Sequence, residues 1–259
     1  MTAALFLLIF WKLSATLHRF TMAEERKKKW FPLESNPGLM NSYVQKLGFD
    51  TSIYEFVDVF STESWALDLV PQPVAAVIML YPLSKNQEDH YKDDTIVPIT
   101  DDTKFWFIKQ RIGNACGTIG LLHALLNAPE GLRGASLDQT SWLGKFYDEC
   151  PPALDPISKA EKLESSDTIE KLHDKATSDE SNQTSRGNIE DQLTTHFVAL
   201  VHANGRLLEL DGRKEGPVDH GSTSPSTLLQ DACKLVQKFM ARDPQEIRFT
   251  IMALAPKHG

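Results

Sequence analysis

The sequence has few cysteines. Only Cys116, Cys150 and Cys233 occur among its 259 residues, and none forms a CxxC pair or has zinc-ligand spacing to a histidine. This argues against a disulfide framework and against the common structural zinc sites. We therefore predict no metal and no cofactor. The chemistry of a reducing compartment fits best, so we expect a cytoplasmic protein, with the nucleus as the alternative.

Basic residues are outnumbered. The chain has 27 Lys and Arg against 35 Asp and Glu, a formal net charge of -8. No basic stripe with interleaved aromatic residues occurs, so we do not expect a nucleic-acid partner. The negative net charge is more compatible with a partner that has a basic protein surface or a cationic peptide tail. The hydrophobic share of 41% is enough for one domain of ordinary size, and we expect a monomer.

Long hydrophobic runs are also lacking. The stretch "AALFLLIFWKL" near the N-terminus holds only about ten apolar residues, where a membrane span needs about twenty, so we expect no stable membrane insertion. A secretory signal requires a basic segment before the apolar run, and none is present here. Arg and Ser are too few for a transit peptide. Two interpretations of residues 1–25 stay open. These residues are a leader that lies outside the fold or is bypassed by alternative initiation of translation, or they are a segment for targeting or membrane association. We expect the folded domain to span residues 26–259.

Helical and strand patterns alternate along the rest of the chain. Strands are predicted over residues 54–60, 74–83 and 101–110, and helices after Pro37, from Cys116 onward and on both sides of Pro151. A hairpin over residues 196–212, a helix and a closing strand follow. The run over residues 74–83 is apolar throughout, which indicates a strand buried on both faces. The order predicts a mixed α/β, or α+β, domain with helices on both faces of a sheet.

One segment is nearly devoid of apolar residues. Residues 173–192, "HDKATSDESNQTSRGNIEDQ", cannot bury enough apolar surface to offset the entropy of ordering them. We predict a long loop there. It is either a solvated insertion or a flap over a site.

The hairpin places a histidine near an aspartate. With Asn204 and Gly205 as the two turn residues, His196 and Asp211 lie on the same face as diagonal neighbours. Such neighbours are about 7 to 8 Å apart by backbone, a distance that the two side chains can bridge. A register slip of one residue would separate them.

Cys116 stands at the predicted start of a helix, in "QRIGNACGTIGLLHALLN". A helix N-terminus favours an anion, so it favours the thiolate that attacks a carbonyl. His196 could accept the thiol proton while Asp211 orients the imidazole. Gln110, at the end of a predicted strand, could donate to an oxyanion together with the Cys116 backbone N–H. We expect His123, on the same helix, to serve packing.

Taken singly, each of these residues is more often structural than catalytic. Together, however, "QRIGNACGTIGLLHAL" resembles the active-site segment of the ubiquitin C-terminal hydrolase family of cysteine proteases. "THFVALVHANGRLLELDGRKEGPVDHG" is similar to the family's His-Asp segment, and the N-terminal "WFPLESNPGLMNSYVQKLG" and the C-terminal "KFMARDPQEIRFTIMAL" also match. The resemblance covers about residues 28–256 and is nearest to the short, single-domain members.

The resemblance implies a papain-like architecture with a mostly antiparallel central sheet. It implies Cys116 as nucleophile, His196 as general base and acid, Asp211 as its orienting residue and Gln110 in the oxyanion hole. The loop at residues 173–192 would be the family's crossover loop above the active site. Ubiquitin would be the partner, cut after its C-terminal glycine to release small adducts or process precursors. The residues implied in ubiquitin contact are Asp58, Pro32, Leu33, Glu34, Ser35, Asn36 and Pro37.

Three alternatives remain open from the sequence. The chain could be a ubiquitin-binding or ubiquitin-stabilising module with slow turnover, or it could process a ubiquitin-like modifier. A general papain-like peptidase fits less well, because the separation of Cys116 from His196 is shorter than is usual in that family.

Overall fold

The computed structural model describes residues 28–90, 94–100, 103–179, 189–190 and 193–257. The predicted leader, residues 1–25, lies outside them. The described strands form one sheet in the order β1-β6-β2-β3-β4-β5, and every neighbouring pair is antiparallel. They are β1 (Tyr54–Asp58), β2 (Ala76–Pro82), β3 (Thr195–Ala203), β4 (Arg206–Leu210), β5 (Val218–Ser222) and β6 (Thr250–Pro256).

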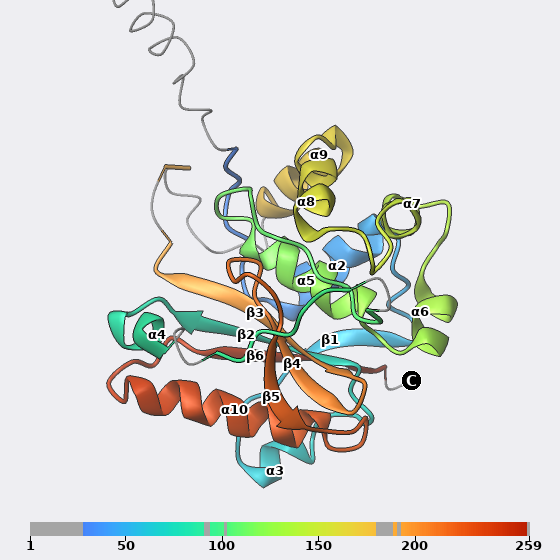
Figure 1. The fold of residues 1–259 in the computed structure, drawn as a ribbon. Coiled ribbons are helices and arrows are strands. Elements are labelled where there is room, and N and C mark those ends of the chain that lie inside the picture. Colours follow the sequence, from blue (N-terminus) through green and yellow to red (C-terminus); the bar gives the residue numbers. More distant parts are fainter. Residues whose placement is uncertain (1–27, 91–93, 101–102, 180–188, 191–192, 258–259) are drawn as a thin grey trace, which may run out of the picture.

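Helices cover both faces of this sheet (Figure 1). The described helices are α2 (Pro37–Leu47), α3 (Ser64–Leu67), α4 (Lys85–Asp89), α5 (Cys116–Leu126), α6 (Glu130–Ser136), α7 (Trp142–Glu149), α8 (Pro156–Glu164), α9 (Asp167–Thr177) and α10 (Leu228–Arg242). In Figure 1, α5, α2, α8 and α9 lie on one side of the sheet and α10 and α3 on the other. The predicted α+β architecture, with an antiparallel sheet between helices, is confirmed.

Side-chain alternation along β3 builds a core on each face. Phe197 and Ala199 pack in the cluster that contains α5, whereas Val198 and Leu200 pack in the cluster that contains α10. All residues of α5 are buried, so the helix that begins with Cys116 lies inside the domain. A helix fixed in this way holds its first residue rigidly.

The local signals for α2 act as the sequence predicts. The Asn36 side chain accepts a hydrogen bond from the Leu39 N–H, Pro37 is the first helical residue, and Gly48 ends the helix with a φ of 111°. An asparagine cap and a left-handed glycine satisfy backbone groups that a helix end leaves unpaired. Local interactions therefore fix both ends of α2, the start at Asn36 and Pro37 and the end at Gly48.

Residues 103–110, the described part of the segment predicted as a strand over residues 101–110, do not form a strand, and that prediction is wrong there. Phe105 to Ile108 are buried, but side chains rather than a neighbouring strand pair with their backbone. Asn127 accepts from the Trp106 N–H at 2.7 Å and donates to the Trp106 carbonyl at 2.8 Å, and His123 Nε2 accepts from the Ile108 N–H at 3.1 Å. An apolar pattern predicts burial but does not say which groups satisfy the backbone.

The polar loop begins later than predicted. Helix α9 continues to Thr177, and His173, at the predicted start of the loop, is buried. The amphipathic face of α9 includes Ile169, His173 and Ala176, which explains why a polar composition still forms a helix there. Residues 180–188 and 191–192, the middle of the predicted loop, lie outside the described residues.

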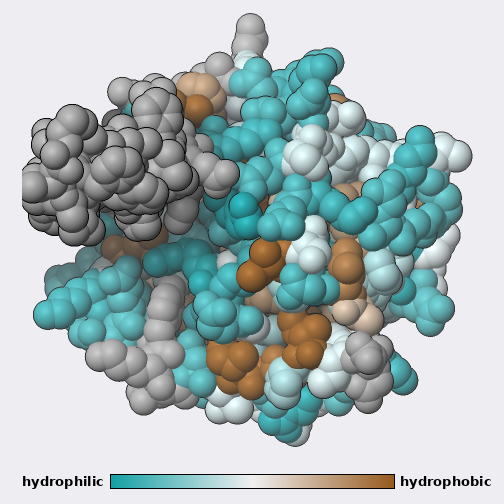
Figure 2. Space-filling view, turned by 45° about the horizontal axis from the view of Figure 1, so that its top comes forward, coloured by the Kyte–Doolittle hydropathy of each residue, from teal (hydrophilic) through white to brown (hydrophobic). Residues whose placement is uncertain are grey.

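Figure 2 shows a face that is mostly hydrophilic, with hydrophobic residues in small patches near its centre. Within the described ranges, no helix has both the length and the apolar character needed to span a membrane.

Candidate active site

Cys116 is the first residue of α5 and is 4% exposed. No side chain caps this helix end, so its free backbone N–H groups point toward the sulfur's surroundings. Asn114, two residues earlier, has a φ of 63°, a left-handed conformation that asparagine tolerates. This sharp bend turns the chain from the buried segment that ends at Gln110 into the helix.

His196 and Asp211 meet as the hairpin register predicts. Asn204 and Gly205 both have positive φ, and the ladder pairs Ala199 with Leu210, the last residue of β4. His196 Nε2 lies 2.7 Å from Asp211 Oδ1, and both side chains are buried. The Arg213 N–H donates to the same carboxylate oxygen at 2.8 Å, which fixes the orientation of Asp211.

The electrostatics favour a charged pair of thiolate and imidazolium. Burial lowers the pKa of His196, but the Asp211 carboxylate outweighs it and raises that pKa to about 9. Burial raises the pKa of Cys116, yet the hydrogen bond and charge of His196, with the Phe197 N–H, bring it below its usual value. Burial also raises the pKa of Asp211, but His196 and the Arg213 N–H hold it low. The proton therefore favours the imidazole over the sulfur.

Gln110 is joined to the loop that carries Asp211. Its backbone N–H donates to the Gly212 carbonyl at 2.8 Å, and its side-chain amide donates to the Ile112 carbonyl at 3.2 Å. A Cβ on Gly212 would lie 3.0 Å from Gln110 Cβ and from Ile119 Cγ2. Glycine at position 212 thus favours the close approach of the loop that carries Asp211 to Gln110 and helix α5.

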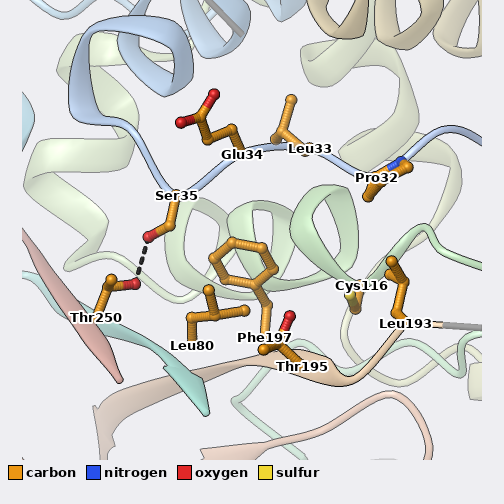
Figure 3. A pocket seen from close by; sticks show the side chains of 10 residues that line it. All are labelled: Pro32, Leu33, Glu34, Ser35, Leu80, Cys116, Leu193, Thr195, Phe197 and Thr250. Carbon is orange, nitrogen blue, oxygen red and sulfur yellow. Dashed lines mark hydrogen bonds between the residues drawn. The ribbon is translucent and has the colours of Figure 1, made fainter. Parts of the chain in front are cut away.

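Cys116 lies in the wall of two pockets. One, of about 280 Å³, is shown in Figure 3 and is lined by Pro32, Leu33, Glu34, Ser35, Leu80, Cys116, Leu193, Thr195, Phe197 and Thr250. The other, of about 330 Å³, is lined by Lys29, Leu83, Gln110, Asn114, Cys116, Leu193, Thr195, His196 and Arg213. Cys116 therefore borders two cavities, one lined by Pro32 to Ser35 and one by His196 and Gln110.

Comparison with known proteins decides the family. Residues 30–241 match the model of "Ubiquitin carboxyl-terminal hydrolase, family 1". The chain belongs to this family. The resemblance seen in the sequence motifs is thereby confirmed, and the protein is a cysteine-type hydrolase, a thiol protease of the deubiquitinating class.

Relatives with this name are similar over most of their length. Ubiquitin carboxyl-terminal hydrolase 3 of Arabidopsis thaliana is 38% identical over 232 residues, which cover 89% of this chain and 95% of that protein. A ubiquitin carboxyl-terminal hydrolase of Aplysia californica is 40% identical over 224 residues, which cover 86% of this chain and 100% of that protein.

A solved structure shares the fold of this hydrolase. The catalytic domain of Trichinella spiralis UCH37, bound to ubiquitin vinyl methyl ester, superposes with a TM-score of 0.69. The match covers 92% of this chain and 99% of that one at 22% sequence identity. The architecture predicted from the family resemblance is thereby confirmed.

The residues implied in ubiquitin contact fall into three groups in this hydrolase. Pro32, Leu33, Glu34 and Ser35 line the pocket of Figure 3 beside Cys116, and Ser35 Oγ lies 2.5 Å from Thr250 Oγ1. Asn36 and Pro37 instead begin helix α2. Asp58 is exposed at the end of β1 and is absent from the pocket lining.

Some parts of the site have little sequence signal. The Phe197 N–H acts on Cys116 through the backbone, and Gly212 acts by having no side chain. The glycine directly after Asp211 is an ordinary strand-end signal, so only the folded contact with Gln110 reveals its purpose. Asn114 carries a weak signal, because asparagine is one of the few residues that enter the left-handed region readily.

Proposed function

We propose that this hydrolase cleaves the bond after the C-terminal glycine of ubiquitin, releasing small adducts or processing precursors. The observation that carries the proposal is the buried His196–Asp211 pair beside Cys116, at the wall of a pocket bordered by the N-terminal segment. The UCH37 domain with the same fold is bound to a ubiquitin ester, which supports ubiquitin as the partner.

Acylation begins with the Cys116 thiolate attacking the glycine carbonyl carbon, whose oxygen takes the negative charge. His196, protonated when the sulfur is ionised, gives its proton to the leaving amine as the carbon–nitrogen bond breaks. The product is a thioester between ubiquitin and Cys116. His196, now neutral, accepts a proton from water, the resulting hydroxide attacks the thioester, and the thiolate leaves.

The oxyanion needs hydrogen-bond donors in a dry site. The Cys116 backbone N–H at the start of α5 is one, and the Gln110 amide, on the lining of the second pocket, is the other. The amide of Gln110 donates to the Ile112 carbonyl through one hydrogen, which leaves its second amide hydrogen for the oxyanion. The hydrogen bond of Gln110 to Gly212 ties these donors to the Asp211 loop.

The two pockets divide the substrate between them. We assign the acyl side, the ubiquitin tail, to the pocket lined by Pro32 to Ser35, where Glu34 is a carboxylate suited to a cationic tail. The leaving group then occupies the second pocket, on the side of His196, which protonates it.

The test is the substitution Cys116→Ala. Turnover of a fluorophore attached to the C-terminus of ubiquitin should fall to background, while the dissociation constant for ubiquitin stays within about threefold, because the thiol acts mainly in the transition state.

Cys233→Ala is the matched control. Burial in the α10 core raises the pKa of that thiol to about 12, so it is not a nucleophile, and turnover should persist. Turnover that survives Cys116→Ala would overturn the proposal. Tight ubiquitin binding with no turnover in the unaltered chain would instead favour a binding module.

A further inference from the structure

The N-terminal strap, which we define as residues 28–35, runs past the start of α5. The Trp30 N–H donates to the Gly113 carbonyl at 2.9 Å, and the Gly113 N–H donates to the Lys28 carbonyl at 2.8 Å. Further on, Leu33 packs against Gly117, where an added Cβ would lie 2.9 Å from Leu33 Cβ. The strap therefore touches the nucleophile loop and the nucleophile helix, and its far half forms the wall of the pocket in Figure 3.

Cavities border successive parts of the strap, although Trp30 and Leu33 themselves are buried in the core. The pocket of Figure 3 lies against Pro32 to Ser35. Another cavity, of about 300 Å³, lies against Trp30 and Phe31 and is lined also by His173, Asp174 and Ile189. Close packing resists displacement only where atoms are in contact on all sides. Where the strap borders these cavities, its position depends on specific hydrogen bonds in addition to the packing of Trp30 and Leu33.

His173 provides the bond at the middle of the strap. Its Nε2 lies 2.7 Å from the Phe31 carbonyl oxygen, and its Nδ1 lies 2.8 Å from Thr118 Oγ1, two residues after Cys116. Its ring also contacts the Trp30 ring, with centroids 4.4 Å apart and the planes tilted by 30°. One side chain on α9 therefore joins the strap to the first turn of α5.

One set of hydrogen-bond directions satisfies every group in this chain of contacts. A carbonyl oxygen only accepts, so Nε2 carries a hydrogen and donates to Phe31. In the neutral ring Nδ1 then accepts from the Thr118 hydroxyl, which can itself accept from Tyr43 at 3.2 Å. Burial raises the pKa of Tyr43, so the phenol keeps the proton that it donates. With a neutral imidazole, each group from Tyr43 to Phe31 therefore has a matching donor or acceptor.

We propose that His173 is a positioning residue, which holds the strap against α5 so that the ubiquitin-tail pocket is formed before substrate arrives. This rests on the proposed function, because it takes that pocket as the site of the ubiquitin tail. His173 does not line the pocket that contains Cys116; it acts through Phe31, the neighbour of Pro32, at which the pocket wall begins.

The test measures ubiquitin affinity in a Cys116→Ala background, with intact ubiquitin and with ubiquitin lacking its C-terminal tail. His173→Leu leaves the Phe31 carbonyl and the Thr118 hydroxyl without this partner, so we expect the dissociation constant for intact ubiquitin to rise on the order of tenfold. Affinity for the tailless form should not change. With Cys116 present, alkylation of the thiol by iodoacetamide should stay within about threefold of the unaltered rate.

Two variants separate positioning from stability. His173→Gln keeps an amide N–H that can reach Phe31, and it should restore most of the tail-dependent affinity. Ile169→Ala removes another buried side chain of α9 and should lower thermal stability while leaving that affinity unchanged. If His173→Leu does not fold, His173→Asn carries the same test, because its shorter side chain cannot bridge both partners.

Three results would overturn the inference. They are an unchanged affinity for intact ubiquitin in His173→Leu, a loss of that affinity in Ile169→Ala as large as in His173→Leu, or a large loss of Cys116 reactivity toward iodoacetamide in His173→Leu. Failure of the proposed function looks different. In that case the chain with native His173 would bind intact and tailless ubiquitin equally.

Discussion

His123 and His196 are both fully enclosed, and both lie within reach of the field of Asp211, yet their pKa values move in opposite directions. Burial lowers the pKa of His123 to about 3, and the Asp211 charge offsets this only in part. The same carboxylate, in direct contact with His196 at 2.7 Å, raises that pKa to about 9. His123 instead faces the Ile108 N–H, for which it must be a neutral acceptor.

The difference teaches that contact with a carboxylate, rather than burial or proximity, decides the role of a histidine here. Removing an imidazolium from water is costly unless an anion is hydrogen-bonded to it. His123 is accordingly a structural residue that supports the segment before Gln110. His196, held by the carboxylate of Asp211, instead keeps a proton.

Asp211→Asn should break the contrast most strongly. The amide cannot stabilise the imidazolium or favour the catalytic tautomer, so His196 would become neutral like His123. We expect kcat to fall by about 10² to 10⁴, by analogy with triads in which the orienting aspartate is replaced. The measurement is turnover of a ubiquitin–fluorophore substrate.

Asp219→Asn is the matched control, since Asp219, on the neighbouring strand β5, pairs with Arg206 at 2.9 Å on the surface. Its kcat should stay within about twofold of the unaltered chain, as is usual for an exposed pair. Equal kcat values for the two variants would show that Asp211 does not govern His196.

The pH dependence sharpens the contrast. The pKa of His196 is raised to about 9, so the imidazolium that protonates the leaving amine persists below that pH and is lost above it. Because the pKa of Cys116 is lowered, the charged pair exists between the two values. We expect kcat to decline above about pH 9, and iodoacetamide to alkylate Cys116 rapidly at pH values where an ordinary thiol, with a pKa near 8.5, is protonated. A thiol that titrates near 8.5 would contradict the charged pair.

His123→Gln should have the smallest effect of these substitutions. It should change the pH dependence of the free energy of unfolding rather than turnover. Its pKa is about 3 in the folded chain and 6.5 in the unfolded chain, so the unfolded chain binds more protons and stability falls as the pH drops below 6.5. Between pH 7 and pH 5 this group costs about 2 kcal/mol of unfolding free energy.

Glutamine keeps an acceptor for Ile108 but does not titrate. In urea unfolding at the two pH values, the stability of the variant should therefore decrease by about 2 kcal/mol less than that of the native sequence. An identical decrease in both chains would show that His123 does not remain neutral.

The parts of the site that follow local rules could be predicted from the sequence. Asn204 and Gly205 set a two-residue turn, and the register that follows brings His196 to Asp211. The place of Cys116 at a helix start is likewise a matter of spacing. Such features depend on nearby residues, so a pattern along the chain contains them.

Other parts depend on contacts between distant segments. Residues 105–108 have a strand pattern, but Asn127 and His123 take the place of a neighbouring strand. His173 lies in a polar stretch whose composition predicts a loop. It is nevertheless part of α9, where it contacts Trp30, Phe31 and Thr118 from distant segments. Composition describes the cost of ordering a segment, but not the partner that offsets it.

The central claim is that Cys116 is a nucleophile ionised by His196 at the end of a ubiquitin-tail pocket. The most direct measurement is capture by ubiquitin bearing an electrophile at its C-terminus, with intact-mass and peptide-level detection in the native sequence and in Asp211→Asn. The account predicts one ubiquitin attached, at Cys116 and not at Cys150 or Cys233, with much slower capture in Asp211→Asn. Attachment at another residue, or an equal rate in the two chains, would contradict it.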